Sequence, residues 1–193
     1  MNPREQEIIG AAINVISRYG VRRTTMADIA AETGISRQTL YASFKNKDEV
    51  LVAVVRAFSA KKLETIVDAW SRLETVEEKI DAFFAVGIVP YFDQMRAMPD
   101  SGDLIGGFNA EGKAEIKKAE DEKAKALSSM FVPFEKALHQ HGTTARALAG
   151  LIVSAADSFI FTARDREHLE ALLESLKLAA LCQLGIKPAK QGR

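Results

Sequence analysis

The chain has little of what catalytic and metal sites are built from. It holds one cysteine and three histidines among 193 residues, which excludes an internal disulfide and a cysteine-rich zinc site. The histidines, His139, His141 and His168, form no metal-binding spacing, and no serine or cysteine lies in a recognisable nucleophile motif. We therefore expect no catalytic residue, no metal and no cofactor. The cysteine, Cys182, lies in the apolar run LAALCQLG, and we expect it to be buried.

Net charge is also lacking, because 26 basic residues face 26 acidic ones. The charge of the whole chain therefore predicts no polyanionic partner. The local balance differs, since the segment from Arg18 to Lys47 has six bases against two acids, an excess of four. A local basic excess on a neutral protein is typical of a small surface that faces phosphates.

Long hydrophobic runs and a signal peptide are missing as well. No run approaches the roughly 20 apolar residues of a membrane span, and the N-terminus MNPREQEII lacks a basic-then-apolar pattern. We expect a cytoplasmic protein without membrane contact. The segment GFNAEGKA nearly matches a phosphate-binding loop, but Ala114 lacks the hydroxyl that would hold Mg²⁺. Nucleotide hydrolysis is therefore not expected.

Helical periodicity runs through most of the chain, and no alternating strand pattern interrupts it. The pattern predicts an all-α protein with about nine helices. We expect an N-terminal domain at 1–50, a larger helical domain at 51–186, and a disordered tail at 187–193. Residues 99–112 are rich in Gly and Asp and predict a loop, and Pro133 should kink a helix over 113–139.

The segment TTMADIAAETGISRQTLYASFKNK has the pattern of two short helices joined by a sharp turn. Thr25 and Ser36 suit helix N-caps, and Gly34 suits the left-handed conformation that ends a helix. Leu40 and Phe44 share one face of the second helix, which leaves its polar residues pointing outward. This arrangement describes a helix-turn-helix, whose second helix enters the major groove of DNA.

The same stretch, through Asp48, Glu49, Val50 and Leu51, resembles the DNA-binding signature of the tetracycline-repressor (TetR) family of bacterial transcription regulators. The resemblance is dense over the first quarter of the chain. It implies base-edge contacts by Ser36, Arg37, Gln38 and Thr39, since Arg and Gln suit bidentate contacts with guanine and adenine. It also implies phosphate contacts by Thr25, Tyr41, Lys45 and Lys47. Ala42 and Ser43 depart from the family pattern.

Reading two-fold DNA sites requires a dimer, and the last two predicted helices offer an apolar surface for one. We predict a homodimer interface that includes Leu148, Leu151, Ile152, Ala155, Leu169, Leu172, Leu173, Leu176 and Ala180. The resemblance implies a four-helix bundle formed by these two helices and their counterparts.

The middle of the chain carries most of the aromatic and methionine side chains, which suit either an ordinary core or an adaptable apolar pocket. Asp157 interrupts an apolar helix and could meet a polar or cationic group of a ligand. The pocket candidates are Phe83, Phe84, Tyr91, Phe92, Met95, Phe108, Met130, Phe131, Phe134, Asp157 and Phe161.

Together these features predict a repressor that an apolar or aromatic small molecule releases from a double-stranded DNA operator. In the mechanism that the resemblance implies, the ligand shifts the helix beginning at Asn46 and changes the separation of the two recognition helices. Two alternatives remain open. One is a DNA-binding regulator without a small-molecule effector, controlled by a protein or acting as an activator. The other is an α-helical enzyme.

Overall fold

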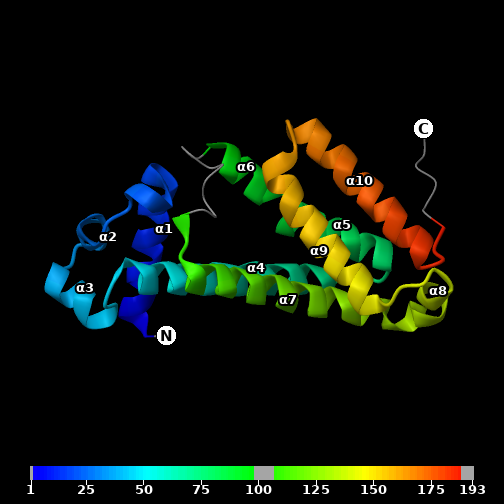
Figure 1. The fold of residues 1–193 in the computed structure, drawn as a ribbon, viewed down its shortest axis with the longest axis horizontal. Helices are drawn as coiled ribbons and strands as arrows, with labels where there is room; N and C mark the ends of the chain where they lie inside the picture. The colour runs from blue at the N-terminus through cyan, green and yellow to red at the C-terminus, as the bar shows by residue number, and fades with distance from the viewer. Residues whose placement is uncertain (1, 98–106, 188–193) are drawn as a thin grey trace. The chain divides into compact units, whose positions relative to one another are not determined.

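Helices make up the regular structure of the protein (Figure 1). The computed structural model describes residues 2–97 and 107–187, and these ranges contain ten α-helices, 3₁₀ turns and no strand. The helices are α1 (Pro3–Arg23), α2 (Met26–Thr33), α3 (Arg37–Ser43), α4 (Lys47–Trp70), α5 (Val76–Gly87), α6 (Val89–Ala97), α7 (Ala110–Phe131), the 3₁₀-helix η3 (Val132–Phe134), α8 (Glu135–Gln140), α9 (Ala145–Thr162) and α10 (Arg166–Gln183). The predicted all-α class is confirmed.

Two prolines mark the places where one helix gives way to the next. Helix α5 ends at Gly87, and Pro90 lies in the first turn of α6. Proline suits that position because the first helical N–H groups have no intrahelical partner. Pro133 interrupts the expected helix over 113–139, since α7 stops at Phe131 and η3 separates it from α8. The predicted kink at Pro133 is confirmed.

The chain divides into two compact units. Unit 1 extends to Lys61 and includes the described part of 96–119, whereas unit 2 holds 62–95 and the described residues from Glu120 onward. The boundary between these compact units therefore falls within α4 and α7. The reason is that the first turns of α4 bury Val50, Leu51 and Val54 in the core of unit 1. The predicted loop lies largely, and the predicted tail almost wholly, outside the described residues.

Unit 1 is organised by side-chain caps at its helix starts. Glu5 N donates to Asn2 Oδ1 at 2.8 Å, and Asn2 N donates to a Glu5 carboxylate oxygen at 3.1 Å, so the pair satisfies exposed amides at the start of α1. Near its end α1 is broken by Gly20, whose φ of 77° only glycine adopts readily. The core of the unit comprises Ile8, Ile9, Ala12, Ile16, Val21, Met26, Ile29, Ala30, Leu40, Phe44, Val50, Leu51 and Val54.

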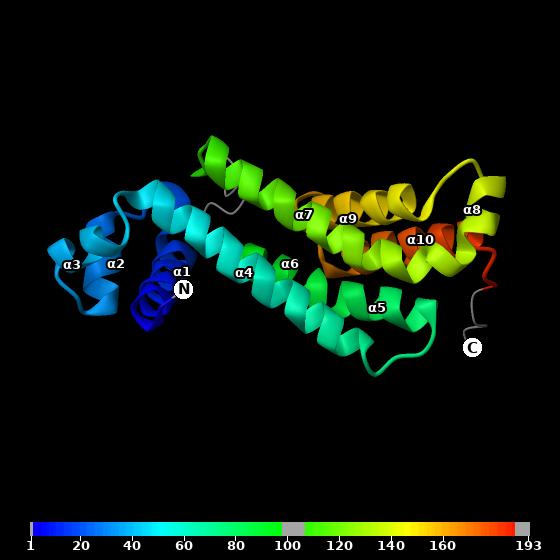
Figure 2. The same cartoon turned by 90° about the horizontal axis from the view of Figure 1, so that it is seen from below.

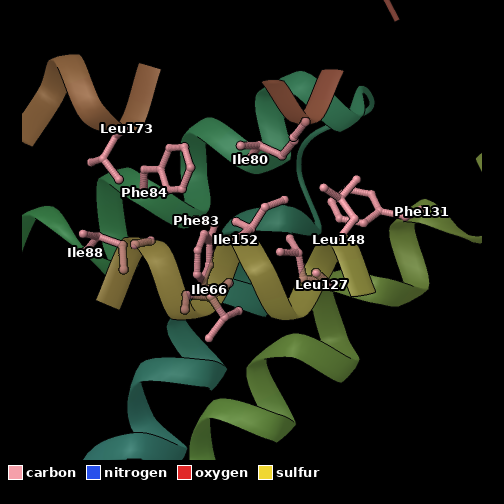
Figure 3. Close-up of a cluster of buried hydrophobic side chains, with 14 of the residues drawn as sticks. Ile66, Ile80, Phe83, Phe84, Ile88, Leu127, Phe131, Leu148, Ile152 and Leu173 are labelled. Atoms are coloured by element: carbon pink, nitrogen blue, oxygen red, sulfur yellow. The ribbon is translucent and has the colours of Figure 1, made fainter. Parts of the chain in front are cut away.

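Unit 2 has its own core, to which α4, α5, α7, α9 and α10 contribute (Figures 2 and 3). Figure 3 shows Phe83 of α5 beside Ile66 of α4 and Ile152 of α9, and all three are almost completely buried. The indole N–H of Trp70 donates to Lys79 O at 2.7 Å, which ties the end of α4 to α5. Because the unit is closely packed in this way, most of its apolar residues serve as ordinary core residues.

Helix α9 is, by length and composition alone, apolar enough to cross a membrane, and it is the one such helix in the described ranges. Seven α9 residues are buried in the protein, among them Leu148, Ile152 and Ala156, so core packing accounts for much of its apolar character. Part of the helix stays exposed, however, and that face is considered below.

Two glycines in unit 1 should respond to alanine in opposite directions. Gly34 adopts φ 73°, where a Cβ costs roughly 1–2 kcal/mol, so Gly34→Ala should lower the free energy of unfolding by about that amount. Gly10 lies inside α1 with nothing within 4 Å of an added Cβ, so Gly10→Ala should raise it by about 0.5–1 kcal/mol. Urea unfolding of both variants measures the difference. Equal effects of the two substitutions would contradict the left-handed turn at Gly34.

Candidate functional site

The turn between α2 and α3 has the geometry that the sequence predicted. Thr25 caps α2, with Asp28 N donating to Thr25 Oγ1 at 3.2 Å and Thr25 N donating to Asp28 Oδ2 at 3.0 Å. Gly34, in the left-handed conformation, ends α2, and its N–H donates to Ala31 O at 3.2 Å. Ile35 N then donates to Ala30 O at 3.1 Å, which reverses the chain. These contacts form the C-terminal motif in which a glycine closes a helix.

Helix α3 has one buried and one exposed face. Leu40 is fully buried, and Phe44, the residue that ends the helix, is also buried in the core of unit 1. The opposite face is exposed, and Tyr41 keeps 50% of its surface accessible there. The exposed residues of this face are Ser36, Arg37, Gln38, Tyr41 and Ala42, with Thr39 half-buried. The face that the sequence predicted for DNA is therefore turned to solvent.

The capping hydroxyls already have protein partners. Ser36 Oγ accepts from Thr39 N at 3.1 Å, and the hydroxyls of Ser36 and Thr39 lie 2.8 Å apart in a hydrogen bond. Thr25 Oγ1 lies 2.6 Å from Asp28 Oδ2, to which it donates. The capping roles of Thr25 and Ser36 are thus confirmed, whereas their contacts with DNA stay predictions. A hydroxyl oxygen can still accept further hydrogen bonds.

Lys47 has three protein partners in this structure. Its Nζ donates to Val21 O at 2.9 Å, to Thr24 O at 2.9 Å and to Arg22 O at 3.2 Å. An ammonium group has three hydrogens, so these carbonyls account for all of them. Lys47 therefore binds the end of α1, where helix carbonyls carry partial negative charge, and its phosphate contact stays a prediction. Sequence spacing did not reveal these partners, because they lie more than twenty residues away along the chain.

One exposed ion pair neutralises a cation of the basic segment between Arg18 and Lys47. Arg18 donates to both oxygens of Glu32 at 2.8 Å, and Asn14 Nδ2 donates to the same carboxylate at 3.3 Å. The hydrogen bond from Arg18 lowers the pKa of Glu32. With Arg18 paired and Lys47 turned inward, Arg37 and Lys45 are the exposed cations in or beside α3.

The aromatic residues predicted to line a pocket fall into several environments. Phe83, Phe84, Phe92 and Phe131 are buried members of the unit 2 core, as the ordinary-core alternative expects. Tyr91, Met95, Met130 and Phe134 are partly buried against that core. Two candidates do not belong to the group. Phe108 packs against the core of unit 1, and Phe161 is 45% exposed on α9.

Asp157 does meet cations, but they belong to the protein. Lys123 of α7 donates a hydrogen bond to Asp157 Oδ2, and Lys62 Nζ of α4 lies 3.7 Å from Asp157 Oδ1. Both lysine side chains are about 10% exposed or less. Sequence spacing did not reveal these partners, because they lie on other helices. A usable signal was that Lys123 precedes Leu127 and Phe131 by one and two helical turns, on the apolar stripe.

The predicted dimer interface needs correction. Five of its residues are buried inside the unit 2 core and cannot also face a partner: Leu148, Ile152, Leu169, Leu173 and Ala180. Ala155, Leu172 and Leu176 are partly buried, while Leu151 is 54% exposed. Periodicity identified an apolar stripe, but it was the stripe that packs within the protein. Cys182, predicted to be buried, is exposed.

A second stripe does face outward on each of the two last helices, which pack against each other in unit 2. On α9 the exposed residues recur every three or four positions, which places them on one side of the helix. We call these residues the outer stripe: Ala147, Leu151, Ser154, Ser158 and Phe161 on α9, and Ala171, Ser175, Leu178 and Cys182 on α10. Small residues among large apolar ones permit close approach of another helix.

Comparisons with known proteins point to one family. The sequence profile described as "Bacterial regulatory proteins, tetR family" matches residues 8–54. The transcriptional regulator BetI of Brucella anthropi is 35% identical over 83 residues, which is 43% of each chain. The nicotine-responsive repressor HdnoR of Paenarthrobacter nicotinovorans is 28% identical over 133 residues, 60% of this chain and 66% of that one.

A solved structure extends the likeness beyond the N-terminal unit. The regulator FadR of Bacillus subtilis, in complex with stearoyl-CoA, superposes with a TM-score of 0.66 at 18% identity, covering 92% of this chain and 98% of that one. At this identity the superposition shows the fold alone. The chain spans about 40% of the length of the first curated relatives that it matches in sequence.

Substitution of Lys47 should destabilise unit 1 even when no DNA is added. Lys47→Met leaves three carbonyls at the end of α1 without their donor, and we expect the free energy of unfolding to fall by about 1–3 kcal/mol. Lys45→Met removes the same charge from an exposed side chain and should change it by less than about 0.5 kcal/mol. Urea unfolding compares the two. Full stability of Lys47→Met would favour the predicted phosphate role.

Proposed function

Because the chain belongs to the tetR family of bacterial regulatory proteins, we propose that it is a DNA-binding transcriptional regulator that acts as a repressor and responds to a small molecule. The family comprises regulators, so the alternative of an α-helical enzyme is rejected. The observation that carries the proposal is the exposed outer face of α3, held outward by the burial of Leu40 and Phe44.

In the proposed complex, α3 enters the major groove of an operator. Arg37 and Gln38, both exposed, contact base edges, with Ser36 and Thr39 at the same end of the helix. Tyr41 and Lys45 contact phosphates, and Thr25 does so through its remaining lone pair. Lys47 contributes indirectly, because it binds the end of α1, directly before the helix-turn-helix begins.

The functional unit in this proposal is a homodimer formed through the outer stripe. The exposed side of α9 and α10 carries Leu151, Phe161 and Leu178, each of which is more than 40% exposed. Large exposed apolar side chains on one side of two neighbouring helices are typical of a protein–protein interface. Two copies that bury the stripe against each other would form a four-helix contact with two-fold symmetry, as two half-sites in DNA require.

An effector acting in unit 2 can influence unit 1 through α4, because this continuous helix belongs to both units. The ligand needs only to prefer the state that does not bind DNA, and a 100-fold preference corresponds to about 2.7 kcal/mol. The printed names of HdnoR and of the FadR complex, which include nicotine and stearoyl-CoA, support a small-molecule effector. The burial of Phe83, Phe84, Phe92 and Phe131 favours the alternative regulator without an effector.

Base readout and phosphate contact should be separable on α3 and its flank. Selection from a random duplex pool would supply the operator. Gln38→Ala should relax preference at one base position at a cost of about 1–3 kcal/mol. Lys45→Met should weaken binding to all duplexes and reduce the salt slope by about one. Uniform loss in both variants would show that the division of roles is wrong, and failure to select any duplex would refute the proposed function.

The dimer should depend on the outer stripe. Leu151→Glu introduces a carboxylate that dimerisation would bury, and we expect the dimer dissociation constant to rise at least roughly 100-fold. Val67→Glu is the matched control, since Val67 is an exposed apolar residue of α4 in the same unit. Sedimentation velocity across a concentration series measures both. Dissociation caused by Val67→Glu and not by Leu151→Glu would move the interface to α4.

A further inference from the structure

Four helices of unit 2 bring an unusual set of charges together inside the protein. Lys62 comes from α4, Lys123 from α7 and Asp157 from α9, and the ring of Tyr91 comes from α6. Lys62 Nζ lies 3.9 Å from the centroid of the Tyr91 ring and 3.7 Å from Asp157 Oδ1. Asp157 Oδ2 accepts the hydrogen bond from Lys123. One carboxylate is therefore shared by two ammonium groups.

The balance of this cluster is positive. The charged groups that act on Lys62 are Lys123, which repels it, and Asp157, which attracts it. Burial, and then repulsion by Lys123, lower the pKa of Lys62 from 10.5 to about 8, which leaves it mostly protonated at neutral pH. Buried charges are normally matched by opposite ones, since an unmatched charge costs several kcal/mol. Here two cations face one anion, and a π-face covers the second cation.

The helices that carry the two lysines are apolar one turn further along the chain. One helical turn beyond Lys62 lies Ile66, and one turn beyond Lys123 lies Leu127, and both are fully buried in the core shown in Figure 3. A strongly hydrated small ion would lose its water in such a setting. An anionic group attached to an apolar body would gain both a counter-charge and apolar contacts.

We propose that Lys62 and Lys123 form the binding site for the anionic head of an amphipathic effector, a carboxylate or a phosphate carried on an apolar chain. This inference rests on the proposed function, to which it adds the chemical class of the effector. The head takes the place of the Tyr91 ring beside Lys62 and completes the charge balance that Asp157 leaves unfinished. Lys123 keeps its hydrogen bond to Asp157, so Lys62 supplies the principal contact with the ligand.

The test compares head groups on one tail. The full-length protein is titrated with decanoate, decyl phosphate, decanamide and decylamine, and binding is followed by the fluorescence of Trp70, the one tryptophan of the chain. We expect at least one anion to bind roughly 10- to 100-fold more tightly than the amide, and the amine to bind more weakly still. The two anions distinguish a carboxylate from a phosphate site. Equal binding of all four probes, or binding of none at roughly millimolar concentration, would overturn the proposal.

Variants assign the effect to the lysines. Lys62→Met leaves Lys123 and Asp157 as a neutral pair and should remove the roughly 10- to 100-fold advantage of the preferred anion. Lys125→Met, an exposed lysine two residues after Lys123, should leave it unchanged. Asp157→Asn removes the one negative charge of the cluster and so makes its net charge more positive. This substitution should tighten anion binding. If Lys62→Met does not fold, the sign of the Asp157→Asn effect decides, and weaker anion binding in that variant would overturn the proposal.

The same samples separate this inference from the function on which it rests. Duplex binding is measured independently, with the operator obtained by selection. A protein that binds its operator but shows no preference for anionic heads refutes the anion site alone. A protein that prefers anions but binds no duplex refutes the proposed regulator and leaves the site standing. When both hold, the preferred anion should lower operator affinity, and Lys62→Met should keep the operator while losing this response.

Discussion

The segment from Thr24 to Lys47, which contains the helix-turn-helix, depends on the attachment of Lys47 to the end of α1. Its ammonium group binds the carbonyls of Val21, Arg22 and Thr24 and so joins the start of α4 to the point where α2 begins. Everything between these points, including the turn at Gly34 and the whole of α3, is a short segment closed by that contact. Because the two ends of this segment are already held together, Leu40 and Phe44 are enough to fix α3 on the small core beneath it.

Local chemistry explains why the sequence predicted this part of the fold. Caps at Thr25 and Ser36 and the left-handed glycine at 34 are determined by residues within four positions of one another. Contacts between residues far apart in the sequence could not be predicted from such local patterns. The partners of Lys47 and the ion pair between Lys123 and Asp157 join helices that only the folded chain brings together.

The two stripes on α9 and α10 show a limit of periodicity. A helical pattern reveals that apolar residues share a face, but it does not say whether the same molecule or another one covers that face. Leu148, Ile152 and Leu169 formed the stronger apolar stripe, and these residues are buried in the core of unit 2. The weaker outer stripe, with serines and alanines between Leu151 and Phe161, was overlooked because its small residues carry little apolar signal. Cys182 was misjudged for a related reason, since an apolar neighbourhood in sequence does not ensure burial.

Arg37, Gln38 and Tyr41 take no part in the hydrogen bond between the hydroxyls of Ser36 and Thr39 that caps α3. Stability and outward chemistry therefore fall partly on different residues of the same short helix. Leu40, Phe44 and the cap keep α3 folded, while its outer residues contribute almost nothing to the core. The outer face can therefore change one residue at a time without unfolding the helix, which makes α3 a permissive position for acquiring or engineering a new DNA preference.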